Sequence, residues 1–191
     1  MKTKDVSIIV ITYNQDLEKL IKTLDSLLIQ EGIDSEIIIC DDGSEKRYEY
    51  QLRDYFSVKN FSDYTLIFHD QNGGTVSNYY SGLEIAKGEY SKLISPGDYL
   101  TDKYTLLHWI RYLKKRKAKW SFSDAYYYHS VHGKADCFRT LAKPQIIRPY
   151  LVKNRNQCIW NYIALEDAAN GAAIIGETRT QLCSDTFAGV L

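Results

Sequence analysis

Two short apolar runs of this sequence end abruptly in polar residues that could bind a ligand. The first run continues into Thr12-Tyr13-Asn14, and the second, Glu36 to Cys40, continues into Asp41-Asp42-Gly43-Ser44. An aromatic ring can stack on a nucleobase, and carboxylates accept hydrogen bonds from base N–H groups and ribose hydroxyls. The two polar segments together therefore predict a nucleoside pocket.

The Asp41–Ser44 segment also has a simpler explanation. An Asp-Gly turn followed by a Ser that caps a helix needs no ligand. The two carboxylates could also help to bind a divalent cation together with phosphates. The combination with Thr12-Tyr13-Asn14 favours a binding role over a plain turn.

Two further loops contain residues that suit phosphates and metals. Asn72-Gly73-Gly74-Thr75 precedes a predicted helix, where glycines let the backbone approach an anion. Its spacing matches neither G-x-G-x-x-G nor the P-loop, and a plain turn explains it equally well. In Ser95-Pro96-Gly97-Asp98, Asp98 could bind a metal that bridges two phosphates. A Pro-Gly turn with a capping carboxylate is the alternative.

The remaining charged clusters are weaker evidence for a functional site than the loops described above. A basic run at a helix C-terminus fits a solvated helix end, and it also predicts a weak attraction to anionic lipid headgroups. We interpret His129, His132 and Asp136 as loop residues, because no fourth metal ligand accompanies them. Glu166-Asp167 is a candidate general base by residue type. The cations of the basic run are Lys114, Lys115, Arg116, Lys117 and Lys119.

The loops described above must be brought together, and the hydrophobic pattern predicts strands alternating with helices. This order implies an α/β fold with a Rossmann-like, mostly parallel sheet, right-handed crossovers and ligands at the carboxyl ends of its strands. Beyond Val131 the pattern weakens. The predicted strands cover 6–11, 36–40, 65–68, 90–94 and 120–128. The predicted helices cover about 17–28, 48–56, 75–87 and 102–117, with Leu106, Leu107, Ile110 and Leu113 facing inward in the last of them.

Composition sets broader limits. A chain of 191 residues with 45% hydrophobic and 25% charged residues fits one soluble domain, or one and a fraction. The formal net charge is zero, so no overall field favours nucleic acid. Four widely spaced cysteines without a C-x-x-C pair indicate a reducing, cytoplasmic compartment and no zinc site. We expect neither a signal peptide nor a membrane span.

The order and spacing of these motifs resemble those of the family 2 glycosyltransferases, which have the GT-A fold. The resemblance covers about residues 5–128. It rests on SIIVITYN, DDGS and NGGT, then on the segment 86–90 (AKGEY) and the loop ending in Asp98-Tyr99-Leu100. It implies a nucleotide-diphosphate-sugar donor, Mn²⁺ or Mg²⁺, and inversion at the anomeric carbon. UDP is the default nucleotide, because it is common in this family.

The resemblance also implies a setting for the protein. The acceptor would be a saccharide or a lipid-linked saccharide, and many bacterial members build capsule or other surface polysaccharide. Residues 1–128 would form the nucleotide-sugar-binding core, and 129–191 would begin an acceptor-side extension of the same domain. We expect a cytoplasmic protein with weak association with the inner face of the membrane.

Individual roles follow from the resemblance as well. Tyr13 would pack on the base, and Ile11 would line it through backbone contact. Asp42, together with Asp41, would bond the base or the ribose. Asp98 would hold the metal. The remaining predicted nucleotide-binding residues are Thr12, Asn14, Asn72, Gly74 and Ser95.

The sequence departs from the family pattern in the donor region. Ser95 and Gly97 stand where the family usually has carboxylates, which leaves Asp98 alone in that loop. Tyr79-Tyr80 replace a common Arg-Asn pair, and this replacement removes a phosphate contact.

The family's later Glu-Asp pair supplies the general base that deprotonates the acceptor hydroxyl. Asp167 of Glu166-Asp167 is the candidate for this role. However, the segment 170–175 resembles the stretch that precedes the pair in the family. That alignment places the base beyond Leu191 and predicts a truncated catalytic domain.

Two other functions compete with glycosyl transfer. A sugar-nucleotide pyrophosphorylase would need a Gly-rich, basic loop after the first strand, and Thr12-Tyr13-Asn14-Gln15 offers none. A degenerate transferase that binds nucleotide-sugar or a partner subunit without turnover would tolerate Ser95 and Gly97. Turnover of the donor separates this binding module from an enzyme.

Overall fold

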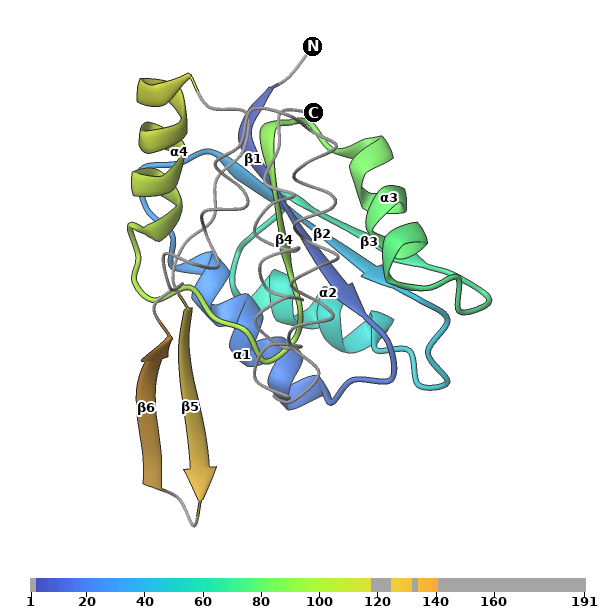
Figure 1. Cartoon of the computed structure of the whole chain (residues 1–191). Coiled ribbons are helices and arrows are strands. Elements are labelled where there is room, and N and C mark those ends of the chain that lie inside the picture. Colours follow the sequence, from blue (N-terminus) through green and yellow to red (C-terminus); the bar gives the residue numbers. More distant parts are fainter. Residues whose placement is uncertain (1–2, 118–124, 132–133, 141–191) are drawn as a thin grey trace, which may run out of the picture. The chain divides into compact units, whose positions relative to one another are not determined.

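A computed structural model describes residues 3–117, 125–131 and 134–140 of the chain. In the first range, four strands alternate with four helices (Figure 1). Each strand predicted within this range lies inside an observed strand, which confirms the predicted α/β alternation. The strands are β1 (Lys4–Thr12), β2 (Ser35–Asp41), β3 (Tyr64–Phe68) and β4 (Gly88–Ile94). The helices are α1 (Leu17–Leu28), α2 (Glu49–Val58), α3 (Thr75–Ile85) and α4 (Thr105–Arg116).

The sheet has the strand order β3-β2-β1-β4, and all three pairs are parallel. The pairs Thr12↔Asp41 and Val10↔Ile94 align the carboxyl ends of the strands along one edge. The chain adds β2 and β3 on one side of β1 and then places β4 on the other. The strand order therefore reverses between β1 and β4, and open α/β sheets bind their ligands at such a switch point.

Both faces of the sheet are covered, which suits strands as apolar as β1 and β2. Successive residues of β1 point to opposite faces, so Ile8 packs in the larger core cluster and Ile9 in the smaller one. The smaller cluster contains Tyr79 of α3, which lies apart from α1 and α2 in Figure 1. Leu107, which we expected to face inward, is only half-buried. The helix residues of the larger cluster are Leu20, Leu24, Leu27, Leu52, Phe56, Leu106, Ile110 and Leu113.

A buried polar link explains why Ser7 interrupts the apolar run of β1. The Ser7 hydroxyl donates to Glu36 Oε1 (2.6 Å) and accepts from the Gly88 N–H (2.8 Å). The Lys87 N–H donates to the same Glu36 oxygen (2.6 Å). These bonds join β2, β1 and the start of β4 and satisfy polar groups that burial would otherwise leave unpaired. A Cβ at Gly88 would collide with the backbone of β1, so only glycine allows this approach.

An antiparallel hairpin, β5 (Ala125–Val131) and β6 (Lys134–Thr140), belongs to a second compact unit. The predicted strand 120–128 is thus confirmed from Ala125, and 118–124 lie outside the described residues. The interpretation of His129 and Asp136 as loop residues is wrong, because they occupy paired positions in the two strands. The predicted domain division after residue 128 falls within β5. No helix within the described ranges is long and apolar enough to cross a membrane.

Candidate functional site

The predicted binding loops meet at the carboxyl edge of the sheet. Thr12-Tyr13-Asn14 leaves β1, Asp42-Gly43-Ser44 follows β2, and the segment 69–74 connects β3 to α3. The Asp42 N–H donates to the Thr12 carbonyl (2.9 Å), and the His69 N–H donates to the Asp41 carbonyl (2.9 Å). The backbone hydrogen bonds between the strands thus continue past the strand ends and hold the loops after β1, β2 and β3 together.

Asp41 is buried and stabilises its own loop. Its Oδ1 accepts from the Ser44 N–H (2.8 Å), and its Oδ2 accepts from the Ser44 hydroxyl (2.7 Å). The Ser44 hydroxyl accepts in turn from the Asn14 N–H (2.7 Å), and Asn14 Oδ1 accepts from the Glu45 N–H (3.0 Å). Asn14 adopts a positive φ of 48°, which asparagine tolerates better than most residues. A nucleotide-binding role for Asp41 stays a prediction, beside this structural one.

Asp42 fixes the loop that leads into α3. The residue is only 4% exposed, and its carboxylate accepts from the Gly73 N–H (2.8 Å) and the Gly74 N–H (2.9 Å). Asn72 Oδ1 also accepts from the Gly74 N–H (2.9 Å). These N–H groups, which the sequence suggested for a phosphate, therefore donate to a carboxylate. Each oxygen of Asp42 retains a second lone pair for a base or ribose group.

Three glycines shape this edge in different ways. Gly43 has a φ of 75°, and a Cβ there would lie 2.7 Å from the backbone carbon of Gln71, so its loop packs closely on the segment before α3. Gly74 and Gly97 also have positive φ values, but a Cβ at either would meet no atom of the described residues within 4 Å. Within the part of the chain that the structure describes, open space therefore lies beside the start of α3 and beside the loop after β4.

The aromatic residues of the site differ in exposure. Tyr13 is 44% exposed, which leaves its ring available for stacking, whereas Thr12 is buried and Ile11 is half-buried. Of the two adjacent tyrosines of α3, Tyr80 is exposed. Tyr79 is buried, and its hydroxyl lies 2.9 Å from Ser91 Oγ. Tyr79 thus joins α3 to β4.

The loop after β4 presents one half-buried carboxylate, that of Asp98. The Asp98 N–H donates to the Ser95 carbonyl (3.0 Å), which closes a turn. No group of three or more His, Cys, Asp or Glu side chains within the described ranges could hold a metal alone. One carboxylate fits a divalent cation that takes its other ligands from substrate phosphates.

Some predicted chemistry lies elsewhere in the chain. The candidate base Asp167, the segment 170–175, His132 and Lys119 lie outside the described residues. Cys40 is buried in the sheet, and burial raises the pKa of its thiol to about 11. The thiol therefore stays protonated near neutral pH and is a poor nucleophile.

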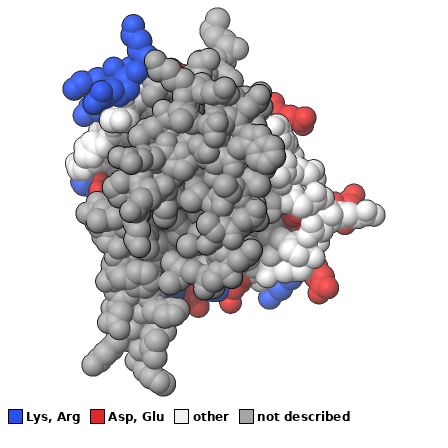
Figure 2. Space-filling view, viewed as in Figure 1, with Lys and Arg blue, Asp and Glu red and all other residues white. Residues whose placement is uncertain are grey.

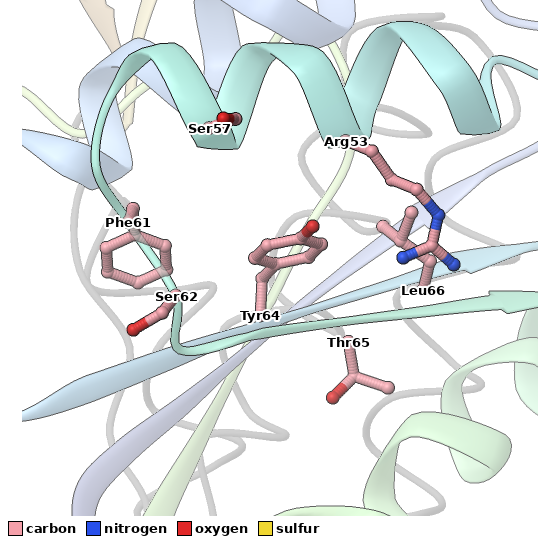
Figure 3. A pocket seen from close by; sticks show the side chains of 7 residues that line it. All are labelled: Arg53, Ser57, Phe61, Ser62, Tyr64, Thr65 and Leu66. Carbon is pink, nitrogen blue, oxygen red and sulfur yellow. The ribbon is translucent and has the colours of Figure 1, made fainter.

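Two cavities lie away from the carboxyl edge and contain none of the predicted site residues. One, of about 570 Å³, lies between α2 and the outer strand β3, where Arg53 reaches toward Leu66 and Thr65 points away from the helix (Figure 3). Arg53 is paired with Glu49 (2.7 Å). The other, of about 360 Å³, surrounds Lys4, whose hydrogen bonds to two aspartates raise its pKa.

Comparisons with known proteins agree with this geometry. The model of the family described as "Glycosyl transferase family 2" matches residues 7–128. No curated protein matches the chain.

Several solved structures share the fold. S. aureus TarS 1-349 in complex with UDP is 23% identical, with a TM-score of 0.52 over 59% of this chain and 33% of that one. Its complex with UDP-GlcNAc is 24% identical, with a TM-score of 0.52 over 59% of this chain and 32% of that one. A third structure is the mannosyltransferase PcManGT from Pyrobaculum calidifontis in complex with GDP-Man and Mn²⁺. It is 20% identical, with a TM-score of 0.53 over 58% of this chain and 34% of that one. The chain therefore spans about a third of the length of these neighbours.

Proposed function

Because the chain belongs to glycosyl transferase family 2 and has a GT-A fold, we propose that it transfers a sugar from a nucleotide-diphosphate donor. The acceptor is a saccharide or a lipid-linked saccharide, in the synthesis of bacterial surface polysaccharide. One observation carries the proposal: the exposed Tyr13 ring and the Asp98 loop flank the switch point between β1 and β4.

The described residues support a division of labour at this edge. Tyr13 stacks on the base, and Asp42 accepts from the base or ribose through its remaining lone pairs. The open space beside Gly74 and Gly97 leaves room for the diphosphate. UDP is the favoured nucleotide, and the UDP complex of TarS supports it. The GDP-Man complex of PcManGT makes GDP the main alternative.

Asp98 is the residue that would hold Mn²⁺ or Mg²⁺. Such a cation, when bound, neutralises charge on the leaving diphosphate. A carboxylate base, Asp167 or one beyond Leu191, would deprotonate the acceptor hydroxyl and give inversion by a single displacement. Metal dependence and inversion are both parts of the proposal.

Calorimetric titration of UDP, GDP, dTDP and CMP, each with and without Mn²⁺, tests the donor site. We expect UDP to bind this chain and Mn²⁺ to tighten its binding, because the diphosphate and Asp98 together complete the ligands of the cation. Tighter binding of GDP would keep the site and change the nucleotide. If none of the four nucleotides binds under either condition, the donor-site proposal fails.

A binding module without turnover is the second candidate, and the absence of carboxylates at Ser95 and Gly97 favours it. Both candidates predict nucleotide binding. Release of UDP from UDP-sugar by the intact gene product separates them, since only an enzyme releases UDP in proportion to time and enzyme concentration.

A basic patch at the end of α4, formed by Lys115, Arg116 and Lys117, suggests where a membrane surface would attract the protein. The last turn of α4 is basic, and Figure 2 shows Lys and Arg side chains gathered where Figure 1 draws this helix. Lys114 beside them is paired with Asp5 (2.8 Å) and Glu89 (3.3 Å). The three patch residues are exposed, and none forms an ion pair within residues 3–117.

We further propose that the basic patch gives weak association with anionic lipid. Each cation near such a surface contributes about 1 kcal/mol, so changing all three patch residues to glutamine should nearly abolish binding. Cosedimentation with phosphatidylcholine vesicles containing phosphatidylserine measures this effect. A matched triple variant on other exposed lysines (Lys19, Lys22 and Lys59 to glutamine) should bind like the wild type. Equal loss in both variants would contradict a role specific to the basic patch.

A further inference from the structure

One side of α1 forms hydrogen bonds to the backbone of the loop that carries Asp98. Thr23, which is fully buried, accepts the Gly97 N–H at its Oγ1 (2.9 Å). The same hydroxyl donates to the Lys19 carbonyl (3.2 Å). Its donor and acceptor functions are thus both used, and α1 holds the Pro96–Gly97 peptide, one residue before Asp98.

Two further side chains continue this row at helical spacing. Ser26 Oγ accepts from the Leu100 N–H (3.2 Å) and donates to the Thr23 carbonyl (2.7 Å). Gln30, just past the end of α1, donates from Nε2 to the Asp102 carbonyl (2.7 Å) and accepts from the Leu106 N–H (3.0 Å). The row Thr23–Ser26–Gln30 therefore follows the loop from its turn to the first turn of α4.

From this row we infer that Thr23 is a positioning residue for the Asp98 carboxylate, an inference that rests on the proposed donor site. Gly97 has a φ of 102°, and a Cβ there would meet no atom of the described residues within 4 Å. No residue in the described ranges packs against Gly97 from that side, so its orientation depends on the hydrogen bond to Thr23 and on the turn bond from the Asp98 N–H to the Ser95 carbonyl. Residues that orient a metal-binding group strongly affect metal affinity, although they do not touch the metal.

Three variants of the full chain separate positioning from general stability. Thr23→Val keeps the shape and removes the hydroxyl, and Thr23→Ser keeps the hydroxyl. Gln30→Met removes the bonds to Asp102 and Leu106 but leaves Gly97 held. We expect hydrogen exchange in 95–101 to be about 3- to 10-fold faster in Thr23→Val, as the loss of one hydrogen bond predicts. We expect wild-type exchange in Thr23→Ser.

Titration of UDP with and without Mn²⁺ provides the second readout. In Thr23→Val, the Mn²⁺-dependent gain in UDP affinity should fall about 10-fold, with metal-free affinity unchanged. Thr23→Ser should restore the gain. Gln30→Met should lower the melting temperature but keep the Mn²⁺-dependent gain in UDP affinity, because this variant leaves the bond between Thr23 and Gly97 intact.

The outcomes distinguish this inference from the proposed function. If Thr23→Val leaves both exchange and the Mn²⁺-dependent gain unchanged, the inference is overturned. The inference is also overturned if hydrogen exchange in 95–101 becomes faster in Thr23→Val while the Mn²⁺-dependent gain in UDP affinity stays at the wild-type level. If the wild type itself shows no nucleotide binding, the proposed function fails, and the positioning role fails with it. A loss confined to Thr23→Val and reversed in Thr23→Ser supports both.

Discussion

Replacing Asp98 with alanine is expected to abolish the Mn²⁺-dependent gain in UDP affinity and to leave metal-free binding in place. Asp98 is the half-buried carboxylate of the loop after β4, and Ser95 and Gly97 supply none beside it, while the exposed Asp102 accepts from the Tyr104 N–H. The cation would therefore lose its protein ligand, while the contacts of Tyr13 and Asp42 with the nucleoside would persist. Calorimetric titration with and without Mn²⁺ measures the difference directly.

Asp54→Ala is the matched control for this experiment, because Asp54 is exposed on the outer side of α2. The Asp54→Ala variant should show the same Mn²⁺-dependent gain in UDP affinity as the wild type. A gain that survives in Asp98→Ala would show that the metal is held elsewhere. Equal loss in both variants would indicate damage that is not specific to the loop.

Replacing Asp42 with alanine is expected to lower the free energy of unfolding by about 2–4 kcal/mol, because two N–H donors lose a charged acceptor in a buried setting. Urea denaturation measures this change through the shift of the midpoint. Nucleotide binding should weaken as well, since the released 72–74 segment forms one side of the open space. Asp42→Asn keeps one acceptor oxygen and should lose about half as much stability.

Asp70→Ala is the control for Asp42, because it lies in the neighbouring loop and its side chain is 96% exposed. Its surface pair with Arg47 should contribute less than about 1 kcal/mol. If Asp42→Ala unfolds at the wild-type midpoint, the bonds to Gly73 and Gly74 do not stabilise the fold. A wild-type midpoint combined with lost UDP binding would assign Asp42 to the ligand alone.

The strands and their order along the chain could be predicted from the sequence because each strand is a short segment rich in β-branched, aromatic or other apolar residues. β1 and β2 are buried on both faces, so their residue types indicate strands without reference to distant parts of the chain. The carboxyl-end loops followed from the same pattern, since parallel strands end at one edge. This is why Tyr13, Asp42 and Asp98 could be grouped before the structure was known.

The contacts between the loops could not be predicted in this way. The sequence placed Asp42 and Gly73-Gly74 in separate motifs, and their bonds depend on how β2 and β3 align side by side. Thr23 and Ser26 look like ordinary polar positions of an amphipathic helix. A weak signal existed in their spacing with Gln30, at i, i+3 and i+7, but only the position of the loop after β4 gives it meaning.

The central place of β1 has a consequence for synthesis of the chain. β1 comes first in the sequence, yet one of its two neighbours is β4, and the bond from the Gly88 N–H to Ser7 spans 81 residues. At roughly 5–20 residues per second, a ribosome needs about 4–16 s to make that stretch. During this time the nascent chain holds an apolar strand with one unpaired edge, a substrate for chaperones and for aggregation.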